Sequence, residues 1–363
     1  MKLEAIIHAL EAWAPPALQE SYDNSGLIAG QKHMEITGCM VSLDVTEAVI
    51  DEAIALGCNL VIAHHPLLFS GIKKLTGSDW VQRTLIKAIK NDIALYALHT
   101  NLDNVQWGVN QKIASILGLK NLRVLDPKPN TLIQMSVFAP HSAAAQVKEA
   151  MWAAGAGQIG DYKDCAFTSE GLGFFRPTGE AQPTIGTIEG HSEVAEQKIE
   201  VIFPKWKMNE VLQAARSSHV YEEMAYYATE LKNLNPEFGS GMIGEWDSPL
   251  PLKQALQLIK DQFGGIIRHT ADLGGTISKV ALCGGSGSFL LGNAIAQKAD
   301  LFLTADFKYH QFFDADNKIV IADIGHFEIE QFTSHLIVDH LRQKFTTFAL
   351  RISTVNTNPV GYY

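Results

Sequence analysis

The chain has 363 residues, with 29 basic and 39 acidic side chains and a formal net charge of −10. Hydrophobic residues make up 47% and charged residues 19%, which predicts a well-packed core and excludes extensive disorder. The acidic balance excludes the broad basic surface that nucleic acids and anionic membranes attract, so we expect neither as a partner.

The N-terminal residues predict an amphipathic helix. Glu4 and His8 interrupt the apolar run of residues 1–10, which is not the pattern of a signal peptide. Apolar stretches all fall well short of the roughly 20 residues that span a bilayer. The four cysteines are far apart and form no CxxC pair, which indicates buried free thiols in a reducing compartment. We therefore expect a cytoplasmic protein without a membrane span.

Short apolar runs in the first and last thirds of the chain end abruptly in polar or small residues. Each run predicts a strand buried on both faces. Helical patterns lie between them at residues 46–56, with Thr46 as the N-cap, and at 80–91 and 289–299. This alternation predicts an α/β fold with a mainly parallel sheet. The runs are residues 39–44, 60–65, 93–99, 280–285, 301–306 and 319–323.

The middle of the chain has a different character. Its predicted order, β-α-β-β-α-β, is typical of a ferredoxin-like fold. We therefore predict one α/β domain, formed by residues 1–127 and 246–363, which is interrupted at 128–245 by an independent α+β insert. The elements expected in this insert are a strand at 132–138, a helix at 143–154, alternating strand segments within 159–204, a helix at 208–217 and a strand at 225–228.

Histidines and carboxylates follow three of the predicted buried strands. Sites in open α/β sheets form at the carboxyl ends of strands, so these side chains are expected to converge. A helix starting near Gly325 would place His326 and Glu330 on one face, at positions i and i+4. For the neighbouring His64 and His65, the alternative is that one is a buried core residue and the other a surface residue. The converging residues are His64 and His65, His99 and Asp103, and His326 and Glu330.

Histidines combined with carboxylates suit Zn²⁺, Mn²⁺ or Fe²⁺. A single ion needs only three or four protein ligands, so this larger set favours two ions that share a bridging carboxylate. Such a pair activates water and holds an oxyanion. Residues 284–287 form a glycine-rich turn, which either cradles an anion or is simply a tight turn. Asp306, Lys308 and His310 either contact the ligands or substrate or are ordinary surface residues.

These motifs, in this order, resemble those of the NIF-three-like proteins, which are often catalogued as GTP cyclohydrolase I type 2 homologues. The resemblance covers nearly the whole chain. It includes the insert, where residues 155–162 and 219–223 are similar to the family's PII/CutA-like middle domain. Two departures are Tyr22, where a Trp often stands, and Ala305, where the family often has Gly. The motifs are residues 23–27, 64–66, 99–103, 284–287, 304–310 and 325–330.

The resemblance implies a dinuclear metal centre and a ring-shaped assembly. It implies two divalent ions per chain, zinc in the first place and manganese or iron as alternatives. It also implies a homohexameric toroid with the metal sites facing an internal cavity. The metal ligands that it implies are His64, His65, Asp103, His326 and Glu330.

The expected function is that of a metal-dependent hydrolase acting on a small anionic substrate. The reaction would be opening of the GTP imidazole ring, or hydrolysis of a phosphoester or cyclic amide by metal-activated water. Glu330 or Asp103 would orient that water, and His99, Lys308 and His310 would transfer protons or bind the substrate. The alternative is a non-enzymatic metal-binding or regulatory protein that acts through its PII-like insert.

Overall fold

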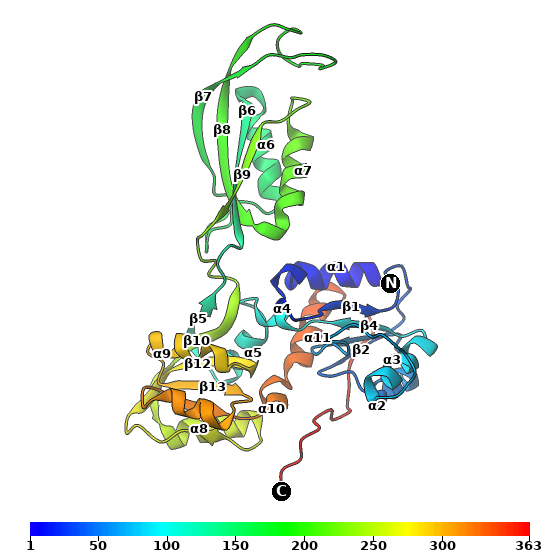
Figure 1. The fold of residues 1–363 in the computed structure, drawn as a ribbon, viewed down its shortest axis with the longest axis vertical. Coiled ribbons are helices and arrows are strands. Elements are labelled where there is room, and N and C mark those ends of the chain that lie inside the picture. Colours follow the sequence, from blue (N-terminus) through cyan, green and yellow to red (C-terminus); the bar gives the residue numbers. More distant parts are fainter. The chain divides into compact units, whose positions relative to one another are not determined.

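The structure, a computed structural model, describes residues 1–363, which pack as two compact units (Figure 1). The first unit combines Met1–Pro127 with Glu237–Tyr363, and the second unit is Lys128–Pro236. The expected end of the insert at residue 245 falls inside strand β10 (Gly239–Pro251), which pairs with strands of the first unit. No helix combines the length and the apolar character needed to cross a bilayer.

One sheet of the first unit has the strand order β1-β4-β3-β2-β15. Strands β2, β3 and β4 are four residues long and buried along their whole length, as the continuous apolar runs predict. They run parallel to one another and to β15, whereas β1 is antiparallel to β4. The strands are β1 (Gly26–Ala29), β2 (Cys39–Ser42), β3 (Leu60–Ala63), β4 (Ala94–Ala97) and β15 (Leu350–Ile352).

Helices α2 (Glu47–Ala55) and α3 (Trp80–Lys90) form the crossover connections between these parallel strands. The Thr46 hydroxyl accepts a hydrogen bond from the backbone N–H of Val49, which confirms Thr46 as the N-cap of α2. Buried side chains of α2 and α3 pack against Met40 and Val61 on one face of the sheet. Helix α11 (Thr333–Lys344) packs against β2, and α1 (Leu3–Trp13) packs against α11.

A second sheet of the first unit has the strand order β11-β14-β13-β12-β10-β5. Strands β12, β13 and β14 are parallel, but β5, β10 and β11 are antiparallel to their neighbours. The prediction of a mainly parallel sheet is therefore wrong, because both sheets of this unit are mixed. The strands are β5 (Lys120–Pro127), β10, β11 (Arg268–His269), β12 (Thr276–Ser286), β13 (Leu301–Ala305) and β14 (Val320–Asp323).

Several helices pack against this second sheet. Its core packs Phe302 and Ile321 from the sheet against Leu291 and Ala294 from α9. Helix α10 follows β14 and packs against β12 and β13. The remaining helical elements of this unit, besides α1, α2, α3 and α11, are η1 (Pro16–Leu18), α4 (Thr100–Asp103), α5 (Val109–Ile116), α8 (Leu252–Phe263), η3 (Ser288–Leu290), α9 (Leu291–Ala296), η4 (Tyr309–Ala315) and α10 (His326–Glu330).

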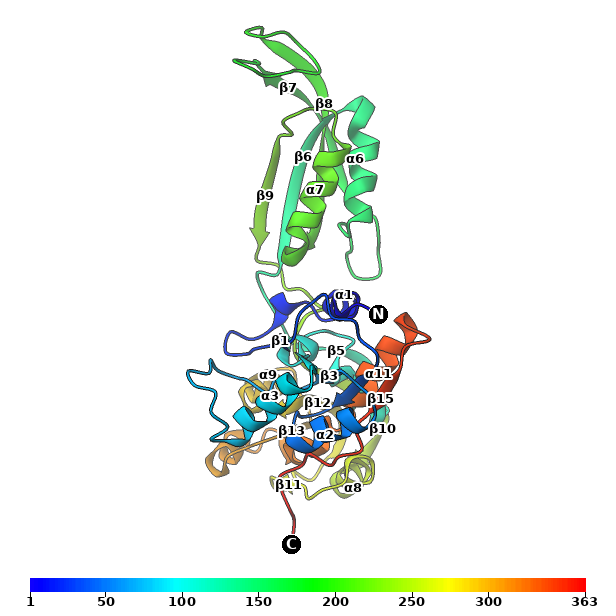
Figure 2. The same ribbon diagram turned by 90° about the vertical axis from the view of Figure 1, so that its right-hand side faces the viewer.

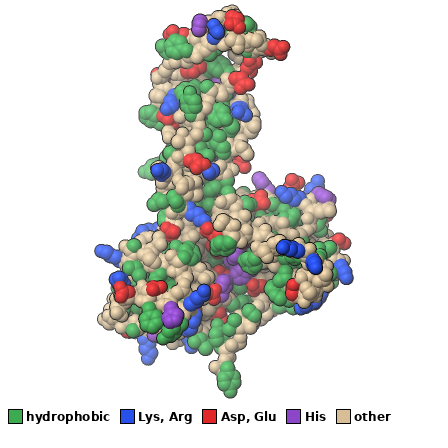
Figure 3. All heavy atoms as spheres, in the orientation of Figure 1, with side chains coloured by type: hydrophobic (Ala, Val, Ile, Leu, Met, Phe, Trp, Pro, Cys, Tyr) green, Lys and Arg blue, Asp and Glu red, His purple; other side chains and the backbone are tan.

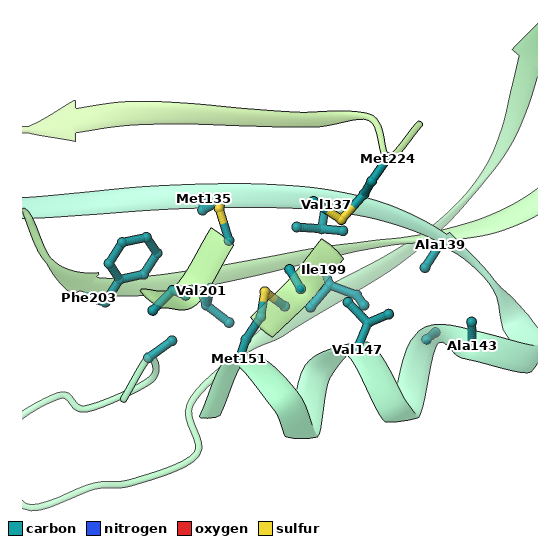
Figure 4. Packing of buried hydrophobic residues seen from close by; sticks show 14 of the residues in the cluster. Met135, Val137, Ala139, Ala143, Val147, Met151, Ile199, Val201, Phe203 and Met224 are labelled. Atoms are coloured by element: carbon teal, nitrogen blue, oxygen red, sulfur yellow. The ribbon is translucent and has the colours of Figure 1, made fainter. Parts of the chain in front are cut away.

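The second unit is an antiparallel sheet, in the order β7-β8-β6-β9, with both of its α-helices on one face (Figures 1 and 2). Met135, Val137 and Ile199 point from the strands toward Val147 and Met151 of α6, which closes a separate core (Figure 4). The elements are β6 (Leu132–Pro140), α6 (His141–Ala153), β7 (Phe167–Phe175), β8 (Ser192–Pro204), η2 (Lys205–Lys207), α7 (Met208–Ser218) and β9 (Tyr226–Leu231).

Candidate metal centre

The predicted ligands come from both sheets of the first unit. His64 and His65 directly follow β3, and their backbone N–H groups still bond to Ser42 O and Leu43 O at the end of β2. Asp103 closes α4, the short helix after β4. The second sheet contributes α10, the helix that begins with His326 and ends with Glu330 after β14. The carboxyl ends of parallel strands from two sheets thus meet at one place.

Glu330 lies at the centre of this group. Its Oε2 lies 3.1 Å from His65 Nε2 and 3.0 Å from His326 Nε2. Its Oε1 lies 3.6 Å from His64 Nε2, which is 3.7 Å from Asp103 Oδ1. Two ligand triads therefore share the Glu330 carboxylate, one with His65 and His326 and the other with His64 and Asp103. The ligand atoms of each triad lie within 4.8 Å of one another.

Each ligand histidine is anchored through its Nδ1 atom. His65 Nδ1 lies 2.7 Å from Asp44 Oδ1, and His64 Nδ1 lies 2.7 Å from the backbone oxygen of Leu98. His326 Nδ1 lies 2.6 Å from Asp306 Oδ2. Because these oxygens can only accept, each Nδ1 carries a proton, so Nε2 is the nitrogen whose lone pair can bind a metal ion once the ring is neutral. Metal-binding histidines are typically held in this way.

The lone pairs of His65 and His326 require a cation between them. Their Nε2 atoms lie 3.2 Å apart, and two unprotonated nitrogens at that distance repel each other. Burial alone would lower both pKa values. The nearby carboxylates outweigh this effect of burial. Asp44 and Glu330 raise the pKa of His65 to about 9. Glu330 and Asp306 raise the pKa of His326 to about 11. A proton fills this role in the metal-free chain, and a divalent ion would fill it equally well.

The other triad also fits a metal ion. His64 Nε2 and Asp103 Oδ1 are buried and have no hydrogen-bond partner, which is rare for polar atoms in a folded protein. Burial lowers the pKa of His64 and keeps its imidazole neutral, as a metal ligand must be. Burial and the neighbouring Glu330 raise the pKa of Asp103 well above its ordinary value. A cation between these groups would stabilise the ionised Asp103.

His99 lies next to these ligands. Its ring centroid is 5.4 Å from those of both His64 and His65, and the ligand nitrogens of these three residues form a further group that could hold a metal ion. Its Nδ1 lies 2.7 Å from Asp23 Oδ1. Burial would raise the pKa of Asp23, but bonds from His99 and Thr100 hold it below its usual range. Asp23 is therefore ionised and keeps the proton of His99 on Nδ1.

The metal group opens into a cleft of about 460 Å³. Histidine side chains are visible in the hollow of the first unit (Figure 3). The cleft wall contains four aromatic side chains but neither lysine nor arginine. These aromatic residues are more than half exposed: Tyr22 68%, Phe69 55%, Trp80 53% and Phe289 64%.

The glycine-rich turn at 284–287 lies against the same group. Gly285 has a φ of +60°, and a Cβ atom at this position would lie 2.6 Å from Glu330 Oε1 and 3.1 Å from a carbon of the His326 ring. Gly284 N–H donates a 2.9 Å bond to Asn110 Oδ1. The turn therefore supports the ligands by close backbone approach, which only glycine allows.

Lys308 and His310 do not join the site. Both are exposed on or next to η4, and neither lines the cleft. His310 instead contacts the exposed rings of Tyr309 and Phe313. Asp306, directly after β13, has a left-handed backbone with a φ of 60°. Within this chain the structure therefore places neither Lys308 nor His310 at the ligands.

Asp23 and Asp44 are the supporting residues that sequence reasoning missed. Asp23 was named only as part of the family motif at residues 23–27, whereas Asp44 closes the run that contains β2. The signal for Asp44 was its position, because it follows a buried parallel strand at the same sheet edge as His64 and His65. Asp306 was among the expected partners of the ligands, and it has that role for His326.

Comparison with known proteins agrees with the resemblance seen in the motifs. The family model for Duf34/NIF3 (NGG1p interacting factor 3) matches residues 1–359. A Halalkalibacterium halodurans protein named GTP cyclohydrolase 1 type 2 homolog is 36% identical over 99% of this chain and 98% of its own length. A Bacillus subtilis protein of the same name is 34% identical, over 99% of this chain and 98% of its own length.

Solved structures of related proteins are also similar to this chain over its whole length. The crystal structure of a Bacillus cereus protein related to NIF3 has a TM-score of 0.88 at 33% identity, covering 100% of this chain and 99% of that one. A Staphylococcus aureus protein has a TM-score of 0.77 at 28% identity, with the same coverage. The chain therefore belongs to the Duf34/NIF3 family.

Proposed function

We propose that the protein is a hydrolase that uses two divalent metal ions, with zinc as the first candidate and manganese or iron as alternatives. The observation that carries this proposal is the position of Glu330, which turns one oxygen toward each ligand triad. His65, His326 and Glu330 would hold one ion, and His64, Asp103 and Glu330 the other. When bound, such ions supply Lewis acidity and lower the pKa of a coordinated water.

We propose His99 as the proton-transfer group of the site. It lines the cleft next to His64 and His65, and its Nδ1 proton is held by the ionised Asp23. This arrangement leaves Nε2 as the atom that takes or gives a proton. Asp23 also accepts bonds from the Thr100 hydroxyl and backbone N–H, which fixes the orientation of the pair.

The lining of the cleft limits how a substrate is bound. Exposed aromatic rings offer stacking surfaces for a planar ring, and no lysine or arginine is present to neutralise several negative charges. An anionic group would have to be held at the metal ions. Ring-containing substrates with one reactive polar group, such as a guanine base or another cyclic amide, suit this cleft better than a bare polyphosphate.

A turnover screen tests the hydrolase proposal. Protein loaded with Zn²⁺, Mn²⁺ or Fe²⁺ is incubated with GTP, guanosine, cyclic dinucleotides, phosphodiesters and small cyclic amides, and products are separated by chromatography. We expect hydrolysis of at least one ring-containing compound, which is lost in a His65→Ala/Glu330→Ala double variant. Absence of turnover by fully loaded protein would contradict the proposal.

The second candidate is a non-enzymatic metal-binding regulator that acts through the insert. It is favoured by the second unit's own core and by its β-α-β-β-α-β order with the strand sequence β7-β8-β6-β9, which suits a ferredoxin-like, PII/CutA-like fold. Metabolite binding that is lost on substitution in the insert, together with no turnover, would favour this function.

We also propose that the chain assembles with copies of itself into a hexamer, as the family resemblance implies. Tyr309 and Phe313 support self-association, because their rings are 72% and 67% exposed and pack against each other with centroids 5.6 Å apart. Analytical ultracentrifugation of the wild-type protein and of Phe313→Asp tests this. A monomeric wild-type protein at micromolar concentration would contradict it.

A further inference from the structure

We propose that the C-terminal tail, residues 353–363, is part of the metal site, because Thr357 holds the carboxylate that orients His65. Asp44 uses its two oxygens for two different partners. Its Oδ1 lies 2.7 Å from His65 Nδ1, and its Oδ2 accepts a bond of 2.5 Å from the Thr357 hydroxyl. The chain of contacts thus runs from the tail to Asp44, then to the ligand histidine.

The tail is fixed to the first sheet just before Thr357. Ser353 N–H donates to Val41 O on β2 at 2.8 Å, which extends the β15 pairing beyond its last residue. The hydroxyl groups of Ser353 and Thr354 lie 2.5 and 2.6 Å from the two carboxylate oxygens of Glu52 on α2. These bonds hold the chain in register, so that Thr357 reaches Asp44.

The tail also reaches the second sheet just after Thr357. Asn358 Nδ2 donates a 3.1 Å bond to Glu328 Oε1, and Glu328 lies on α10 between His326 and Glu330. Asn358, Val360 and Tyr362 line a cavity of about 600 Å³ that also exposes His65 and His326. The tail, red in Figure 1, therefore covers a side of the ligands other than the one that faces the aromatic cleft.

The Thr357 hydroxyl restricts the rotation of the Asp44 carboxylate. Without it, Asp44 Oδ2 loses its donor, and the carboxylate can turn away from His65 Nδ1. The imidazole would then lose the contact that fixes both its ring plane and its tautomer. Loss of such an outer contact typically lowers metal affinity by about 10- to 100-fold. The inference rests on the metal centre proposed above but does not depend on catalytic turnover.

The test compares four proteins: wild type, Thr357→Val, Thr357→Ser and Thr354→Val. Valine keeps the shape of threonine and removes the hydroxyl, and serine keeps the hydroxyl. Thr354→Val is the matched control, because it removes one hydroxyl–carboxylate bond from the same tail without touching Asp44, while the Ser353 hydroxyl and the Thr354 backbone N–H still bond to Glu52 and keep the tail in register. Zn²⁺ affinity is measured by competition with a chelating dye, the Co²⁺ absorption spectrum reports ligand geometry, and circular dichroism checks folding.

We expect Thr357→Val to weaken binding of one ion by about 10-fold or more and to shift the Co²⁺ spectrum. Thr357→Ser should restore both, and Thr354→Val should match the wild type. Equal affinities and spectra for Thr357→Val and Thr354→Val would overturn the inference while leaving the metal centre standing. If the wild type itself bound no ion, both the inference and the metal centre would fail.

Discussion

His65 Nε2 and His326 Nε2 lie 3.2 Å apart, although the two residues are separated by 261 positions in the chain and follow strands of different sheets. Each histidine is held from behind by its own aspartate, so neither nitrogen can turn away without losing that bond. The fold thus forces two lone pairs together beside the Glu330 carboxylate. A cation at this point joins the two sheets.

Metal content is the most direct check. Wild-type protein purified with divalent metal should contain close to two ions per chain, because each ligand triad provides a separate site. A His65→Ala/Glu330→Ala double variant should lose most of this content, as measured by plasma mass spectrometry. His310→Ala serves as the control, since His310 is exposed outside the cleft, and its content should equal the wild type. Full occupancy in the double variant would refute the ligand assignment.

Metal binding should release protons. The raised pKa values of about 9 for His65 and about 11 for His326 mean that the metal-free protein carries protons here at pH 7. An entering ion displaces them, so its affinity should rise with pH. Calorimetry in two buffers of different ionisation enthalpy should show release of about one proton or more per chain. Binding that is independent of both buffer and pH between 6 and 8 would contradict this.

The same pKa shifts predict how the stability of the metal-free protein depends on pH. Both histidines have folded pKa values above the unfolded value of about 6.5, so their pairing with carboxylates stabilises the fold fully below that pH. This contribution is lost as the pH rises through about 9 and then about 11. Urea unfolding of the chelator-treated protein should show lower stability at pH 10 than at pH 7, and a bound metal should reduce the difference.

Replacing Asp23 should slow the reaction without removing the metal. Asp23→Asn takes away the charge that holds the Nδ1 proton of His99, and loss of a positioned proton-transfer group typically costs about 10²-fold or more in rate. The turnover number and metal content are measured together, with Lys308→Met as the control outside the cleft. Unchanged turnover in Asp23→Asn would remove His99 from the proposed reaction.

Gly285→Ala should destabilise the protein. A residue with a side chain is strained at a φ of +60°, and its Cβ would press against Glu330, so we expect a loss of about 1–3 kcal/mol. Urea unfolding provides the measurement. Gly275→Ala is the matched control, because its Cβ would meet no atom within 4 Å. Equal stability of the two variants would show that the turn tolerates a side chain.

Most metal ligands could be predicted from the sequence, because they follow the carboxyl ends of buried parallel strands. Parallel buried strands give continuous apolar runs, and the polar residues at their carboxyl ends meet, which brought His64, Asp103 and Glu330 together. This rule about strand ends does not place Lys308 in the cleft, and Asp306, just after β13, has a left-handed backbone. A sequence shows the end of a strand but not the direction in which the next segment leaves it.

The mixed character of the sheets was not predictable in the same way. Strands β5 and β10 have partly exposed burial patterns, because antiparallel strands at the side of a sheet keep one face in contact with solvent. A search for continuous apolar runs passes over such strands. The same omission placed the end of the insert at 245, inside β10. Asp23 was missed because its only local pattern is that of a turn, and its contact with His99 spans 76 residues.

The separation of His65 from His326 also has a consequence during synthesis. At a translation rate of about 5 to 20 residues per second, a ribosome needs roughly 10 to 50 s to extend the chain from His65 to His326, 261 positions later. For that time the nascent chain carries His64, His65 and Asp103 without the helix that completes their site. The second unit emerges in this interval and contains its own core. Ions therefore reach a finished centre only after His326 and Glu330 have been made, so metal occupancy marks chains whose distant segments have come together.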